Sequence, residues 1–224
     1  MVVRTQANAP QRSGSSGLNA LAGHAVSCSK FKYQRGTEIF GEAEPVDYLY
    51  QIKSGAVRCY KLLADGRRQI MAFHLLGDIF GVENGPVHRF TAEAIVETTV
   101  CLTDRQNVVD GEEEDGRAAA INNVLRLVTS NLQHAETHML LLGRKTAIEK
   151  VAAFLIEMDV RLSAAGVLSL PMSRRDVADY LGLTLETVSR ALSQLRDRDV
   201  LTFIGRSHRQ IVLRDRAKLA EFDH

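Results

Sequence analysis

Three features of this 224-residue sequence predict an α+β fold. Short apolar runs separated by turn residues favour an antiparallel β-sandwich or barrel in the first half. A seven-residue apolar repeat then predicts one long helix. Near the C-terminus, two short helical patterns flank a glycine and two apolar runs follow, an order typical of a winged helix-turn-helix. We therefore expect a flexible leader over 1–25, a β domain over 26–114, a dimerisation helix over 115–143 and a winged helix-turn-helix domain over 144–224.

The composition is that of an ordinary globular protein, with 45% hydrophobic and 25% charged residues. No apolar run approaches the ~20 residues that a membrane-spanning helix needs. The cysteines at 28, 59 and 101 lack CxxC spacing, which predicts reduced thiols in a cytosolic protein rather than disulfides or a zinc site. There is neither a catalytic triad pattern nor a Gly-rich nucleotide loop, so we do not expect an enzyme.

The β domain is predicted from apolar or alternating runs bounded by turn signals. Asp65 and Gly66 stand between two such runs, and this pair favours a hairpin turn because glycine tolerates positive φ. The predicted strands cover 48–52, 56–60, 69–73, 92–96 and 99–102.

The long helix carries an apolar stripe with alternating spacings of four and three residues, which is typical of a coiled-coil seam. A narrow seam needs a partner surface, and we expect a second copy of the chain to supply it. The alternative is that the helix packs on its own domain. The predicted dimer interface consists of Ile121, Leu125, Val128, Leu132, Ala135, Met139 and Leu142. Gly143 follows the stripe as a predicted hinge or C-cap, and a further helix is predicted over 147–158.

The helix-turn-helix pattern begins at Ser173, which with Asp176 three residues later resembles a capping box. Gly182 is expected to end this helix, and Thr184 to cap the next one. Two apolar runs, 200–204 and 210–213, then predict a hairpin wing with a basic tip.

Such a second helix fits the major groove of DNA and presents its first turns to base edges. Arginine can donate two hydrogen bonds to guanine, and glutamate can accept one from cytosine. The alternative is a helical hairpin in a core, with Glu186 and Arg190 forming a surface pair. The predicted base-reading residues are Leu185, Glu186, Ser189 and Arg190, and the predicted phosphate-contacting or positioning residues are Ser173, Arg174, Arg175, Thr184, Thr187, Arg206 and Arg209.

Residues 174–190 resemble the winged helix-turn-helix of the CRP/FNR family. Residues 48–57 and 73–81 are similar to the family's β-roll, a jelly roll of the cyclic-nucleotide-binding type. The trio Glu186, Ser189 and Arg190 resembles the FNR and FixK branches, and FixK looks nearest. This resemblance implies a homodimeric activator that binds a TTGA-type palindrome in double-stranded DNA, contacts RNA polymerase and controls genes of microoxic respiration and nitrogen fixation.

The sequence departs from the family's ligand-binding patterns. Cyclic-nucleotide-binding members carry a Gly-Glu pair and a later Arg-Ser or Arg-Thr, whereas Val82 follows Gly81 here and Phe90 follows Arg89. An iron–sulfur cluster needs about four thiolates, and Cys28 stands alone in the leader region. We therefore expect no cofactor and no metal. The alternative is an effector-dependent sensor of a cyclic nucleotide or of haem, with His74 or His88 as a haem ligand.

Overall fold

The computed structural model describes residues 3–4, 17–109, 114–144, 146–164, 166–205 and 209–223. The chain divides into two compact units, Met1–Leu62 with Met71–His134 and Leu63–Ile70 with Ala135–His224. Among the described helices, none combines the length and the apolar character that a membrane span requires. The two units are described in turn.

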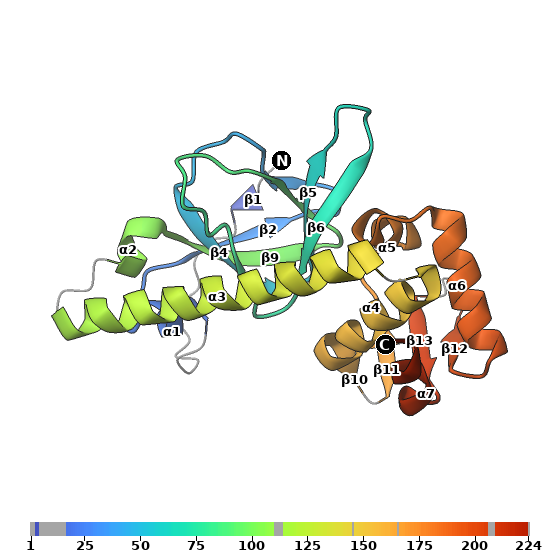
Figure 1. Ribbon diagram of the computed structural model, residues 1–224. Coiled ribbons are helices and arrows are strands. Elements are labelled where there is room, and N and C mark those ends of the chain that lie inside the picture. Colours follow the sequence, from blue (N-terminus) through green and yellow to red (C-terminus); the bar gives the residue numbers. More distant parts are fainter. Residues whose placement is uncertain are drawn as a thin grey trace. The chain divides into compact units, whose positions relative to one another are not determined.

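Two antiparallel sheets build the first unit (Figure 1). Their strand orders are β1-β2-β9-β4-β7 and β3-β8-β5-β6. All five strands expected from the sequence are present, which confirms the β-roll. The bounds are β1 Val3–Arg4, β2 Ser29–Tyr33, β3 Glu38–Phe40, β4 Tyr48–Ser54, β5 Val57–Leu62, β6 Arg68–His74, β7 Ile79–Phe80, β8 Thr91–Ala94 and β9 Thr98–Asp104.

Alternation along the strands places one face of each sheet in a shared core. In β5, for example, Val57 and Cys59 are buried while Arg58 and Tyr60 are partly exposed. The predicted turn at Asp65 and Gly66 joins β5 to β6, and Gly66 has the positive φ of 80° that such a turn favours. The core members are Tyr33, Phe40, Tyr50, Ile52, Val57, Cys59, Phe80, Ala92, Ala94 and Val100.

A second apolar cluster forms around two short helices, α1 Leu18–Ala22 and α2 Arg105–Val109. Leu18, Leu21 and Ala22 of α1 are buried, although the sequence pattern placed them in the flexible leader. The leader residues 1, 2 and 5–16 lie outside the described residues. Helix α1 therefore extends the apolar core of the first unit beyond its sheets.

The prediction that all three cysteines are reduced is wrong for two of them. Cys28 and Cys101 form a disulfide, whereas Cys59 is a free, buried thiol. The physical reason is strand pairing: β2 lies beside β9 with Lys30 opposite Cys101, so Cys28 arrives next to Cys101. A separation of 73 residues gives no local sign of this contact.

Helix α3, Glu114–Arg144, contains the predicted heptad stripe. Val124 and Leu127 on another side of the helix pack against the α1 cluster. Gly143 was predicted to act as a hinge or C-cap, but the helix continues through it to Arg144. The helix therefore packs one face against the first unit and carries the apolar stripe on another face.

The second unit combines helices with a small four-stranded sheet of order β10-β11-β13-β12. The predicted helix after Gly143 is α4, which buries Val151, Phe154, Leu155 and Met158. The bounds are α4 Ala147–Leu162, β10 Ser163–Ala164, β11 Val167–Ser169, α5 Arg174–Leu181, α6 Leu185–Asp197, β12 Leu201–Ile204, β13 Gln210–Leu213, α7 Arg216–Ala220 and the 3-10 helix η1 Glu221–Asp223.

Candidate DNA-binding interface

Helix α5 begins in the capping box that the sequence predicts. The Ser173 hydroxyl accepts a hydrogen bond from the Asp176 backbone N–H, and the Asp176 carboxylate accepts one from the Ser173 backbone N–H. Gly182 ends the helix in the left-handed conformation, with φ 62°, and its N–H donates to the Ala178 carbonyl. These two caps define a short, rigid first helix of the motif.

Helix α6 begins after Thr184, whose hydroxyl accepts a hydrogen bond from the Thr187 backbone N–H. The helix buries Val188, Ala191, Leu192 and Leu195 against its own unit. Since these positions occupy one side of the helix, the other side is left for a ligand.

The predicted base-reading residues lie on this other side of α6. Glu186 and Arg190 are exposed, and Leu185 and Ser189 are partly exposed. None of the four is buried in the protein, so this face of the helix is open to solvent. The first two turns of α6 thus present a carboxylate, a hydroxyl and a guanidinium together.

Local electrostatics keep Glu186 ionised. A hydrogen bond from its own backbone N–H and one from the Thr184 hydroxyl lower the pKa of Glu186. The nearby positive charges of Arg175 and Arg190 lower the same pKa further. A charged carboxylate accepts hydrogen bonds only, which suits the amino group of cytosine.

Arg174, the first residue of α5, connects the two helices and the wing. Its Nη1 donates to the Ser189 hydroxyl at 3.3 Å, and its guanidinium lies over the Phe203 ring at 5.3 Å from the centroid. Burial lowers the pKa of Arg174. The sequence did not single out Phe203, because an aromatic residue inside a strand pattern gives no sign of a cation above its ring.

The other predicted phosphate contacts differ in their surroundings. Arg175 is exposed. Arg209 lies just before β13 and donates from Nη1 to the Pro171 carbonyl at 3.5 Å. The Ser173 hydroxyl already donates to Asp176 at 2.7 Å, and the Thr187 hydroxyl is within 3.0 Å of the Thr184 hydroxyl. Arg206, which the sequence analysis predicts at the basic tip of the wing, lies outside the described residues.

A contact that sequence reasoning missed supports α5 inside the second unit. Arg68 donates to Asp176 and to Asp179, each at 2.7 Å from Nη2. Burial by itself lowers the pKa of Arg68, but the hydrogen bonds and charges of the two carboxylates raise it overall. Residues 108 and 111 positions apart meet here, so no local pattern announces the pairing.

The predicted dimer interface forms an exposed apolar stripe on α3. Ala135 is exposed as well, whereas Leu142 is only partly exposed. The exposed fractions of Ile121, Leu125, Val128, Leu132 and Met139 range from 44% to 65%. Large apolar side chains in a continuous row on a solvated helix favour a protein partner.

The residues at the place of the family's phosphate-binding cassette pair with one another. Arg89 Nε donates to Glu83 at 2.7 Å, and the Arg89 guanidinium lies 5.5 Å from the centroid of the Phe90 ring. The two histidines considered as haem ligands stack on phenylalanine rings, His74 on Phe80 and His88 on Phe40. Within the part of the chain that the structure describes, no three potential metal ligands cluster together.

Comparison with known proteins agrees with both halves of this architecture. Residues 30–111 match the family model of the cyclic nucleotide-binding domain, and residues 149–222 match that of the Crp-like helix-turn-helix domain. The nitrogen fixation regulation protein FixK of Rhizobium meliloti is 44% identical over 169 residues, which cover 75% of this chain and 76% of that protein.

Two further proteins that resemble this chain are also FixK proteins. FixK of Azorhizobium caulinodans is 41% identical over 196 residues, covering 85% of this chain and 77% of that protein. The solved structure of FixK2 from Bradyrhizobium japonicum has a TM-score of 0.80 and 54% identity, and the match covers 89% of this chain and 98% of that one. The chain therefore belongs to the CRP/FNR family of transcription regulators, which bind DNA and are not enzymes, and it is similar to the family's FixK proteins.

Proposed function

We propose that this protein activates genes of nitrogen fixation and microoxic respiration by binding a TTGA-type palindrome as a homodimer and contacting RNA polymerase. The FixK relatives support the part of the proposal that concerns nitrogen fixation, since they are named as nitrogen fixation regulators. One observation carries the proposal: Glu186, Ser189 and Arg190 stand together on the solvent side of a helix that is capped at its start.

The base contacts follow from the chemistry of these side chains. Arg190 donates two hydrogen bonds to O6 and N7 of a guanine, and the ionised Glu186 accepts one from a cytosine amino group. Ser189 reads a neighbouring base edge, and its bond from Arg174 orients the hydroxyl. Leu185 supplies an apolar contact for a thymine methyl group.

The positive charges around this helix position the protein on the DNA backbone. Arg174, Arg175, Arg206 and Arg209 contact phosphates, and such contacts fix the register without reading sequence. Ser173, Thr184 and Thr187 act as positioning residues, because their hydroxyls hold the helix starts. Loss of any cap shifts the reading side chains relative to the groove.

The homodimer forms through the apolar stripe of α3. Two-fold symmetry then places a pair of α6 helices roughly 34–36 Å apart, one turn of DNA, so each reads one half-site of a palindrome. Control by a cyclic nucleotide is not part of the proposal. Arg89, which a cyclic phosphate would need, pairs with Glu83.

Selection of bound DNA from a random pool tests this function. The selection is run at a stated salt concentration, because phosphate contacts make affinity strongly salt-dependent. We expect a palindrome with TTGA-type half-sites to be enriched without any added ligand. Enrichment of no sequence, or of a single half-site bound by one chain, would contradict the proposal.

A further inference from the structure

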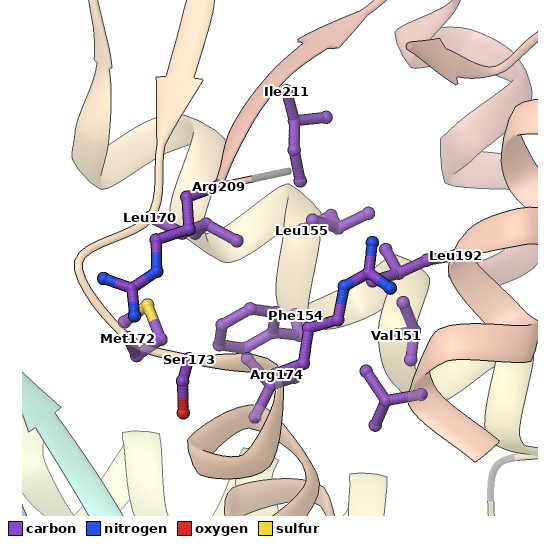
Figure 2. A pocket seen from close by; sticks show the side chains of 12 residues that line it. Val151, Phe154, Leu155, Leu170, Met172, Ser173, Arg174, Leu192, Arg209 and Ile211 are labelled. Carbon is purple, nitrogen blue, oxygen red and sulfur yellow. The ribbon is translucent and has the colours of Figure 1, made fainter. Parts of the chain in front are cut away.

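A cavity lies inside the second unit, between the helix-turn-helix and the wing. Its volume is about 220 Å³. Its walls come from α4, α5, α6 and β13 and are apolar over most of their extent, with Phe154, Leu155, Met172 and Leu192 among them. Figure 2 shows the Phe154 ring near the middle of the lining side chains, between Met172 and Val151. An unfilled apolar space of this size forgoes packing contacts that a bound molecule would restore.

Among the described residues that line the cavity, the charged side chains are those of two arginines, Arg174 and Arg209. Figure 2 shows them on opposite sides of the space, with the Ser173 hydroxyl close to the α5 start. The lining contributed by the part of the chain that the structure describes contains no carboxylate. The acidic residue next in the chain, Asp176, is held by the capping box and by Arg68. The cavity is therefore mainly apolar, with one arginine on each of two opposite sides.

Burial of Arg174 adds to this polarity. Its guanidinium lies over the Phe203 ring, and desolvation lowers its pKa. A partly desolvated cation attracts an anion more strongly than one in bulk water, because fewer water dipoles screen it. Guanidinium groups also match the geometry of carboxylates, to which they donate two parallel hydrogen bonds.

We propose that this cavity binds a small monocarboxylate with an apolar body, placing its chain or ring against Phe154 and Met172 and its carboxylate between Arg174 and Arg209. The size suits such a ligand, since an engineered apolar cavity of about 150 Å³ binds benzene. A space of about 220 Å³ therefore holds one ring or a chain of a few carbons besides the carboxylate. The ligand therefore needs an apolar body, which packs against the apolar walls, and a negative charge, which pairs with the arginines.

Binding would oppose DNA binding, a consequence that rests on the proposed function. Arg174 and Arg209 are proposed phosphate contacts, and a carboxylate between them competes with phosphate for the same N–H donors. The ligand would thus weaken the attachment of the helix-turn-helix to every DNA sequence, without touching the base-reading residues of α6. The site itself can be tested on the free protein, with no DNA present.

Methionine methyl NMR provides the direct test, because the five methionines include one reporter and internal controls. Met172 lines the cavity, whereas Met158 is buried elsewhere in the second unit and Met71 and Met139 are exposed. The probes are hexanoate, hexan-1-ol and acetate, added to the full chain at matched ionic strength. We expect hexanoate to shift the Met172 methyl signal in a saturable way and to leave Met139 unchanged.

The two other probes separate body from charge. Acetate should not shift Met172, because it has no apolar body to fill the space. Hexan-1-ol should bind more weakly than hexanoate, since its neutral hydroxyl can accept a hydrogen bond but gains no attraction between opposite charges. Equal affinity for hexanoate and hexan-1-ol, or equal shifts of all methionines, would overturn the proposal.

Two variants test the lining directly. Arg209→Gln should weaken hexanoate binding roughly tenfold, the loss expected for one charge-assisted hydrogen bond. Arg214→Gln is the matched control, since Arg214 is exposed beyond β13 and does not line the cavity. Leu170→Phe fills the space while keeping both arginines, and it should abolish binding. Unchanged hexanoate affinity in Arg209→Gln and Leu170→Phe would refute the site.

DNA binding is then measured separately by fluorescence anisotropy. Hexanoate should weaken binding to the selected palindrome in the parent protein but not in Leu170→Phe, and acetate should have no effect beyond its ionic strength. A saturable Met172 shift without any loss of DNA affinity would refute the phosphate role of the two arginines and leave the ligand site standing. Absence of the Met172 shift would refute the ligand site whatever the DNA result.

Discussion

Helices α3 and α6 both leave one side exposed, but the two sides differ in chemistry. The exposed stripe of α3 is apolar, with Leu125 60% and Met139 65% exposed. The exposed side of α6 is polar, with Glu186 and Arg190 in solvent and its apolar residues buried. Burial of an apolar row by another protein is favourable, because it removes apolar surface from water. The polar row lies on a helix whose first turn is already capped, so it is stabilised by a polar ligand rather than by burial.

The largest expected effect comes from adding charge to the α3 stripe. Leu125→Glu combined with Leu132→Glu should dissociate the proposed dimer, because the glutamates would be buried against each other. Binding through two linked half-sites can be about 10²–10⁴-fold tighter than binding through one. The affinity for the palindrome should therefore fall at least ~100-fold. Sedimentation and fluorescence anisotropy measure the two effects.

The control is Ser130→Glu, which adds one glutamate to an exposed position of α3 outside the stripe. This variant should remain dimeric and bind DNA normally. A dimer that survives both stripe substitutions would show that the stripe has another role. The exposed side of α3 would then not be a surface for a second copy of the chain.

A smaller loss is expected at the polar side of α6. Arg190→Ala removes a bidentate contact to guanine and should cost about 1–3 kcal/mol of binding free energy at the preferred site. The loss of binding free energy should be smaller on DNA sites in which another base replaces the guanine that Arg190 contacts. Anisotropy titrations with the four single-base variants of one half-site measure this, and equal losses on all four would rule out base reading by Arg190.

A smaller and different change is expected at the wing. Arg209→Ala should weaken binding to all sequences alike and lower the slope of log affinity against log salt by about one. Comparison with Arg190→Ala distinguishes a phosphate contact, which positions the protein on DNA, from a base contact, which reads the sequence. An unchanged salt slope would count against a phosphate contact at Arg209.

The smallest effect concerns the core of the β-roll, where neither ring nitrogen of His88 has a hydrogen-bond partner within the described residues. Burial lowers the pKa of His88 from its ordinary 6.5, although Glu83, Glu44 and Asp47 act to raise it. The unfolded chain then binds a proton at a higher pH than the folded one. The free energy of unfolding should therefore fall as pH drops from about 6.5 toward the lowered pKa, and stay constant above.

Urea unfolding at several pH values tests this expectation. His88→Phe keeps the ring stacked on Phe40 and should remove the acid-side loss of stability. His134→Gln, on α3, should retain the loss. A parent protein whose pH profile matches that of His88→Phe would show that His88 does not titrate in this range.

Local patterns predicted much of the fold. The five expected strands, the helix α4 and both caps of α5 are present, because each depends on residues a few positions apart. Turn, cap and alternation rules operate over the same distance. Gly143 shows the limit of such rules, since α3 passes through it although glycine alone disfavours helix.

The exposed side of α6 could also be predicted from the sequence, whereas the distant contacts that support the helix pair could not. Glu186, Ser189 and Arg190 follow at helical spacing from the buried Val188, Leu192 and Leu195. By contrast, nothing local indicates that Arg174 lies over Phe203 or that Arg68 reaches Asp176. Those partners meet only when separate segments pack together.

The amino-acid sequence by itself determined which residues turn inward and which turn outward along each helix and strand, because those directions repeat every 3.6 or 2 residues. Tertiary structure alone decided which distant residues meet. It joined Cys28 to Cys101, because β2 pairs with β9, and it enclosed a mainly apolar cavity that two arginines help to line. The reason is that contacts between elements depend on strand order and on how loops return the chain, which no short stretch of sequence encodes.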